Sequence, residues 1–194
     1  TGIQSVAEKI DVLSTSEYID VINDLSIAQG NGAVFNEEDI SRIGRGTDWQ
    51  DEVYRSAPLT NHNLAVSGGS ENTSYYASFN YFDQEGVVKN SGIKRYTGRI
   101  NLETKVGDKA QIGLNFNTSL IKDNNNVDGV NTNEQAGPIY SSLLYDPTET
   151  IFNEDGTFGQ SSNLTVNNPV TLINAIISES ETNRTFGSAF LNYD

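Results

Sequence analysis

Apolar and polar residues alternate in four successive runs between Asn61 and Leu120. Successive side chains of a β-strand point to opposite faces, so each run predicts a strand with one apolar and one polar face. No lysine, arginine, aspartate or glutamate falls on an apolar position in any run. The apolar positions are, run by run, Leu64 and Val66; Tyr75, Ala77, Phe79 and Tyr81; Tyr96, Gly98, Ile100, Leu102, Thr104 and Val106; and Ala110, Ile112, Leu114, Phe116, Thr118 and Leu120.

Two folds produce such strands, and the spacing of the runs bears on the choice. A soluble sandwich covers the apolar face with a second layer, whereas an outer-membrane barrel turns it toward lipid. The connections at 68–72 and 107–109 are short, and those at 83–94 and 122–183 are longer. Because short and long connections alternate in a membrane barrel, the pattern favours the barrel, with the sandwich as the alternative. Charged side chains suited to a wet lumen occupy polar positions of the third run: Arg95, Arg99, Glu103 and Lys105.

The first sixty residues predict short helices instead of strands. Ser14 and Glu17 have the spacing of a capping box, which predicts a helix over 15–29. Asn36 and Asp48 are good N-cap residues and predict two further short helices, the first ending at a glycine and the second closed by a proline. We expect these helices to belong to a loop at the end of the sheet.

Composition excludes several classes of function. The chain has no cysteine, so disulfides and thiolate metal sites are absent. Its net charge of −14 opposes nucleic-acid binding, which needs a basic surface. No apolar run approaches the 18 residues of a membrane-spanning helix. His62, the single histidine, is predicted to make ordinary hydrogen bonds beside Asn61 and Asn63, so we expect no catalytic residue and no cofactor.

One asparagine-rich segment has a partial metal-binding pattern. Asn124, Asn126, Asp128 and Gly129 resemble the start of a calcium loop, but Gln135 stands where the bidentate glutamate belongs. Asparagine at the first ligand position and glutamine at the last remove charge that the cation needs. We therefore expect an asparagine-rich loop in preference to a calcium site.

Six of the nine tyrosines fall into two predicted groups. Tyr75, Tyr81 and Tyr96 lie on the apolar face near strand ends, where an aromatic girdle at the membrane interface accounts for them. Three others occupy the polar face or the long connection and are the candidate substrate-binding residues. These are Tyr76, Tyr140 and Tyr145.

A resemblance to a known family supports the barrel. Residues 47–58, TDWQDEVYRSAP, resemble the segment TDWQDEIFRTAP of the SusC/RagA family of TonB-linked outer-membrane transporters, and residues 61–69, NHNLAVSGG, resemble its NHNLSVSGG. Similar matches follow at YYAS (75–78), QEGVV (84–88) and RYTGRINL (95–102). The likeness covers about Asp48 to Phe116.

The resemblance implies an all-β fold, namely the antiparallel wall of a partial transmembrane β-barrel with short helices in the N-terminal loop region. It implies import of oligosaccharides or peptides across the outer membrane, with a SusD-like surface lipoprotein, TonB and outer-membrane lipid as partners. The charges on the polar face would more often dock a plug domain than select a substrate. A soluble carbohydrate-binding β-sandwich is the alternative, and a glycan hydrolase comes third.

With no methionine, the chain is expected to be a fragment of such a transporter, comprising the first extracellular loop and early barrel strands. We expect four regions of one barrel domain: a loop region with helices at 1–60, four strands at 61–121, a long extracellular loop at 122–183 and the start of a further strand at 184–194.

Overall fold

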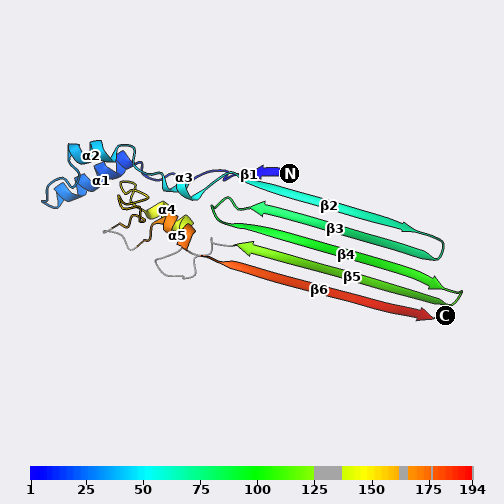
Figure 1. The fold of residues 1–194 in the computed structure, drawn as a ribbon. Coiled ribbons are helices and arrows are strands. Elements are labelled where there is room, and N and C mark those ends of the chain that lie inside the picture. The colour runs from blue at the N-terminus through cyan, green and yellow to red at the C-terminus, as the bar shows by residue number, and fades with distance from the viewer. Residues whose placement is uncertain (125–136, 162–165, 176, 194) are drawn as a thin grey trace.

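Six antiparallel strands form one sheet, and the helices gather at one end of it (Figure 1). The computed structural model describes residues 1–124, 137–161, 166–175 and 177–193. The strands are β1 (Gly2–Gln4), β2 (Ala57–Gly69), β3 (Thr73–Glu85), β4 (Gly92–Val106), β5 (Ala110–Asn124) and β6 (Glu179–Tyr193). The helices are α1 (Thr15–Ala28), α2 (Glu37–Ile43), α3 (Trp49–Val53), α4 (Pro138–Leu144) and α5 (Pro169–Ala175). None of the helices in these ranges is both long and apolar enough to cross a bilayer.

The strands pair in sequence order, so neighbours in the chain are neighbours in the sheet. Phe79 lies opposite Leu64 on one side and Gly98 on the other, and Ile100 lies opposite Phe116. Residues directly opposite one another point to the same face. The register therefore brings the apolar positions of all four predicted runs onto one face and the polar positions onto the other.

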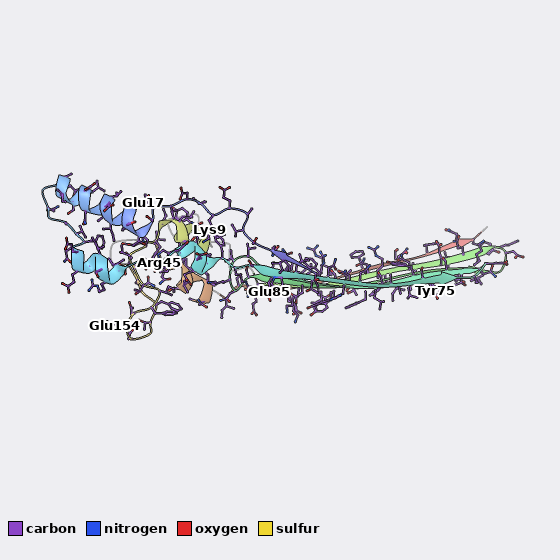
Figure 2. The ribbon with its side chains drawn as sticks, turned by 90° about the horizontal axis from the view of Figure 1, so that it is seen from above. Lys9, Glu17, Arg45, Tyr75, Glu85 and Glu154 are labelled. Atoms are coloured by element: carbon purple, nitrogen blue, oxygen red, sulfur yellow. The ribbon has the colours of Figure 1, made fainter. Side chains whose placement is uncertain are left out.

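The apolar face has no covering layer from the described residues. Ile100 is 49% exposed and Leu114 is 43% exposed, although both lie in the middle of the sheet. Seen along its edge, the sheet is a single thin layer from Glu85 near the helices to Tyr75 toward the far end (Figure 2). The predicted antiparallel barrel wall is confirmed. The second layer that the sandwich alternative needs is not found among the residues that the structure describes.

The three predicted helices are confirmed with their caps. Ser14 and Glu17 form a full capping box at the start of α1, and Asn36 forms another with Asp39 at the start of α2. The carboxylate of Asp48 accepts hydrogen bonds from two backbone amides of α3. These local hydrogen bonds satisfy amide groups that have no partner within the helix. For this reason the short helices could be recognised from the sequence.

Other features were not predicted. β1 is a short strand that pairs with the start of β2, and β2 begins at Ala57, before Pro58, so this proline does not close α3 as expected. The connection expected over 83–94 is only a turn at 86–91, because β3 and β4 continue further than their alternating runs indicated. α4 and α5 lie within the segment that we expected to be loop.

The buried core lies among the helices and not on the sheet. We call α3, α4, α5, the turn at 86–91 and the segment 145–161 the cap. One cluster joins Trp49, Tyr145 and Val166, and a second joins Val53, Val88 and Ile173. Because α3 supplies one residue to each cluster, it holds the β3–β4 turn, α4 and α5 together.

Candidate functional site

The apolar face is a continuous surface of one chemical kind that runs across the sheet. Its large side chains come from every long strand and remain accessible in this chain. Soluble proteins rarely expose contiguous apolar patches of more than a few hundred Å², so this face requires an apolar environment. The exposed members on this face include Leu64, Val66, Tyr75, Phe79, Ile100, Leu102, Ile112, Leu114, Phe116, Leu191 and Tyr193.

A row of aromatic side chains ends this face on the side of the cap. The His62 and Tyr81 rings are stacked with centroids 6.4 Å apart, and Tyr81 and Tyr96 are 5.2 Å apart. Amphipathic rings of this kind lie at the interface between hydrocarbon and water. These two tyrosines are neighbours on the apolar face, and the ring of His62 stacks on that of Tyr81.

Charged side chains follow immediately beyond the aromatic row. Lys94 lies 3.3 Å from Asp83, and Lys122 lies 3.3 Å from Glu181, all on the same side of the sheet as the apolar residues. From Tyr96 to Val106 the strand rises roughly 34 Å, or roughly 26 Å of height at a 40° tilt. That height is close to the apolar band of roughly 25 Å on an outer-membrane barrel.

The polar face carries charges that no described residue neutralises through an ion pair. The guanidinium of Arg95 lies 5.1 Å from the centre of the Phe82 ring, a cation–π contact. Within the described residues no ion pair forms at Arg99, Glu103 or Lys105. By contrast, the lysines and arginines that form ion pairs all lie in the helical end or at the strand ends beside it. The polar face is therefore chemically open to groups outside this chain.

The three candidate tyrosines have different surroundings. Tyr76 lies on the polar face, opposite Ser67 and Asn101, and Tyr140 is 45% exposed on α4. Tyr145 is only 4% exposed: its ring meets Trp49 at 4.7 Å, and its hydroxyl donates to Gly159 and accepts from the amide of Ser161. A ring with both faces covered cannot stack on a ligand, so Tyr145 is a packing residue of the cap.

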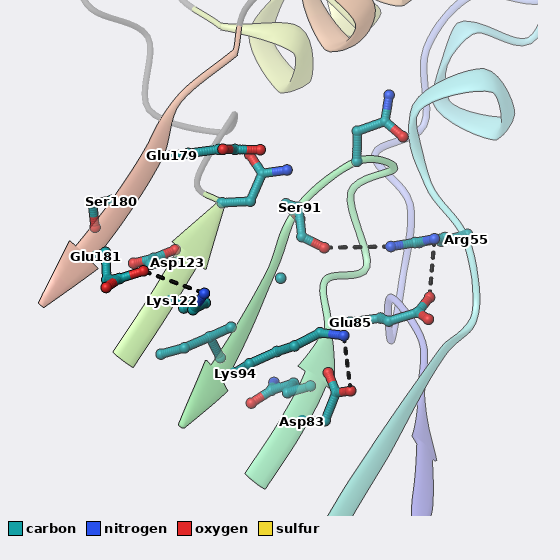
Figure 3. A pocket seen from close by; sticks show the side chains of 15 residues that line it. Arg55, Asp83, Glu85, Ser91, Lys94, Lys122, Asp123, Glu179, Ser180 and Glu181 are labelled. Atoms are coloured by element: carbon teal, nitrogen blue, oxygen red, sulfur yellow. Dashed lines mark hydrogen bonds and ion pairs between the residues drawn. The ribbon is translucent and has the colours of Figure 1, made fainter. Parts of the chain in front are cut away.

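Arg55 anchors the β3–β4 turn beside a cavity of about 670 Å³ (Figure 3). It forms an ion pair of 3.0 Å with Glu85 and donates to the carbonyl oxygens of Gly86 (3.1 Å) and Ser91 (3.3 Å). Its backbone amide also donates to Val87, at 2.8 Å. Sequence reasoning missed this residue, because its partners lie about thirty positions away and no local pattern marks them.

Tyr18 and Glu149, in the helical end, have displaced pKa values. The Tyr18 hydroxyl donates to Asp146 at 3.0 Å, and burial together with the negative charge of Asp146 raises the pKa of Tyr18 to about 12. Burial, and then the charge of Asp146, also raises the pKa of Glu149 above its usual value. Both pKa values rise because burial and the nearby negative charge of Asp146 disfavour the ionised form of each group.

No candidate metal site lies within the described residues: no group of three histidine, cysteine, aspartate or glutamate side chains converges there. The possible calcium pattern, apart from Asn124, falls on residues 125–136, outside the described ranges.

Comparison with known proteins gives a consistent result, although no family model matches the chain. TonB-dependent receptor P26 of Formosa agariphila is 33% identical over 196 residues, covering 100% of this chain and 19% of that protein. TonB-dependent receptor P3 of the same organism is 40% identical over 118 residues, covering 58% of this chain and 11% of that protein. TonB-dependent receptor SusC of Bacteroides thetaiotaomicron is 29% identical over 150 residues, covering 76% of this chain and 14% of that protein.

Solved structures share the fold. The RagAB peptide importer in its 'open-open' state matches with a TM-score of 0.73 and 18% identity, covering 100% of this chain and 25% of that chain. The 'closed-closed' state matches with a TM-score of 0.71.

A two-faced antiparallel sheet with a helical cap at one end is thus a segment of the barrel wall of a TonB-dependent receptor. Within that class, the chain belongs to the SusC/RagA family and spans about a fifth of the length of the first relative. The matched proteins are receptors and transporters and not enzymes.

Proposed function

We propose that the whole protein imports oligosaccharides or peptides across the outer membrane. TonB delivers the energy for this import, and a SusD-like surface lipoprotein captures the substrate. The observation that carries this proposal is the uncovered apolar face, closed at one end by the row of His62, Tyr81 and Tyr96. Similarity to SusC, a TonB-dependent receptor, supports TonB-driven import, and the likeness to the RagAB peptide importer supports peptides as one cargo class.

The segment then serves as wall and rim. The apolar face contacts lipid, the polar face lines the lumen, and the cap with α1 and α2 lies on the extracellular side. This assignment follows from the short turns at the other end, since barrels carry short periplasmic turns and longer extracellular loops. We propose that the α1–α2 arm meets the lipoprotein, because it projects from the cap away from the sheet (Figures 1 and 2).

Two of the three candidate tyrosines keep a proposed ligand role. Tyr76 faces the lumen, and the exposed Tyr140 lies where cargo would pass the rim. An aromatic ring with a free face stacks on a sugar or on a peptide side chain.

Membrane extraction and uptake test the proposal. The full-length protein should sediment with outer membranes, require detergent for extraction and migrate faster on gels before boiling than after it. Uptake of a fluorescent oligosaccharide or peptide by cells should stop when TonB is deleted. A protein that stays soluble without detergent, or uptake that persists without TonB, contradicts the proposal.

A further inference from the structure

A hollow of about 350 Å³ lies on the polar face between β4, β5 and β6. Its side chains come from two adjacent cross-strand rows: Arg99, Asn117 and Phe186 in one, and Asn101, Asn115 and Ser188 in the other. The volume lies within the range of small-molecule pockets, roughly 300–1,000 Å³. The hollow thus combines one cation, three amides, a hydroxyl and an aromatic ring on a rigid sheet.

The hydrogen-bonding groups of this hollow are largely unused. Asn115 donates weakly to Ser188 at 3.4 Å. Arg99, Asn101 and Asn117 make no side-chain hydrogen bond or ion pair with any other residue in the described ranges. A guanidinium offers five donors in a planar fork that matches a carboxylate. Arg99 is thus free to bind an anionic group, with Asn117 directly opposite it.

Phe186 differs from the neighbouring phenylalanine of the same strand. The ring of Phe190 lies over Gly113, where a side chain would collide with it, so this ring is used in packing the sheet. Phe186 is 65% exposed on the polar face. An exposed ring beside unpaired amides is typical of a surface that binds a ligand with both apolar and polar parts.

We propose that this hollow is a cargo subsite that binds a carboxylate-bearing unit, with the carboxylate on Arg99, polar groups on Asn101 and Asn117, and an apolar face on Phe186. The inference rests on the proposed import function. The carboxylate belongs either to an acidic sugar or to a peptide. The competing occupant of this surface is the receptor's own plug domain, and the experiment separates the two.

The test uses the full-length receptor in detergent, in which β6 has its neighbouring strand. The probes are two matched pairs, each with one charged and one neutral member. The first pair is hexagalacturonate and its methyl ester, and the second is a heptapeptide with a free C-terminal carboxylate and the same peptide with a C-terminal amide. The variants are Arg99→Gln and, as the matched control, Lys105→Gln, which removes the same charge from the same face of β4 about 20 Å away. Asn117→Asp supplies a second variant that keeps Arg99 and places a carboxylate opposite it.

Wild type should bind the charged member of at least one pair more tightly, and Arg99→Gln should weaken only that member, by about tenfold or more. Asn117→Asp should likewise weaken binding of the charged member alone. Lys105→Gln should leave the preference for the charged member unchanged. The pair that responds identifies the source of the carboxylate. Equal loss for charged and neutral members, or equal loss in Lys105→Gln, overturns the subsite.

The remaining outcomes also count against the subsite. Easier release of the plug by urea in Arg99→Gln, with unchanged binding preference, assigns the hollow to the plug and overturns the inference. Failure of wild type to bind any probe overturns it as well. None of these results touches the import function, which fails only if membrane extraction or TonB-dependent uptake fails.

Discussion

At the scale of single residues, the cap depends on Trp49. This side chain is 3% exposed, meets Tyr145 edge to face and donates its indole N–H to the carbonyl oxygen of Asp146 at 2.8 Å. It therefore links α3 to the segment that follows α4 by packing and by a buried hydrogen bond.

Truncation of Trp49 should loosen the cap. We expect Trp49→Ala to cost about 3–5 kcal/mol of local stability through the cavity that it leaves. Trp49→Phe keeps most of the packing but removes the hydrogen bond to the Asp146 carbonyl oxygen, which still accepts from the amide of Glu149, so it should cost about 0.5–1.5 kcal/mol. Amide hydrogen exchange of residues 145–161 in the full-length receptor measures both. Tyr140→Ala, at an exposed position, is the control. If it lowers the exchange protection of residues 145–161 as much as Trp49→Ala does, the role of Trp49 in holding the cap together is contradicted.

Tyr18 makes the stability of the helical end depend on pH. Its pKa is about 12 in the folded chain and near 10 in an unfolded one, so the folded state retains its proton more strongly. The stabilisation is fully present below pH 10 and is lost as the pH rises toward 12. Exchange protection of α1 should fall across this window in the wild type. Tyr18→Phe should remove this dependence, and an unchanged pH profile in the variant argues against Tyr18 as its source.

At the scale of elements, the cap is attached to the sheet through the β3–β4 turn. Val88 inserts between Val53 and Ile173, Arg55 binds the two ends of the turn, and Asn90 reaches the carbonyl oxygen of Ile173. Three segments distant in sequence thus meet at one short turn. This arrangement fixes the cap to the end of the sheet.

Removal of the Arg55 side chain should release this turn. Arg55→Ala deletes one ion pair and two hydrogen bonds to backbone carbonyls, and we expect a local cost of about 1.5–3 kcal/mol. Faster hydrogen exchange over 86–91, with unchanged exchange in the turn at 107–109, is the expected result. Lys109→Ala provides a control at the opposite end of the sheet. Unchanged protection of 86–91 would show that the apolar contacts alone hold the turn.

At the scale of the whole molecule, the sheet separates two environments by the alternation of its side chains. Ile100 and Asn101 are adjacent in β4, yet they point to opposite faces. A one-residue shift in register would exchange the two faces completely. The separation of apolar from polar side chains is thus set by the pairing of the strands.

This pair of residues gives a direct test of the two faces. Ile100→Arg places a charge against hydrocarbon near mid-strand, and we expect a loss of about 2–4 kcal/mol in folding free energy in lipid vesicles. Asn101→Arg places the same side chain in water and should change the stability by about 0.5 kcal/mol or less. Urea titration of the gel-shifted folded form measures both. Equal losses at the two positions would remove the basis for a lipid-facing side.

Sequence patterns predicted features that depend on near neighbours. The capping boxes at Ser14 and Asn36 use hydrogen bonds within a few residues, and the strands follow from a period of two. The burial of Tyr145 and the roles of Arg55 and Val88 could not be predicted, since each depends on partners far away in the chain. Phe186 was missed as a candidate ligand contact because its face depends on the pairing of β6 with β5.

The sequence by itself therefore determined that the strands have two chemically different faces and that helices begin where capping side chains stand. Only the tertiary structure decided that the apolar face stays uncovered, that the core lies in the cap, and which polar side chains share the hollow at Arg99. The physical reason is range: caps and alternation act between adjacent residues, whereas burial and the composition of a site depend on which strands pair and in which register.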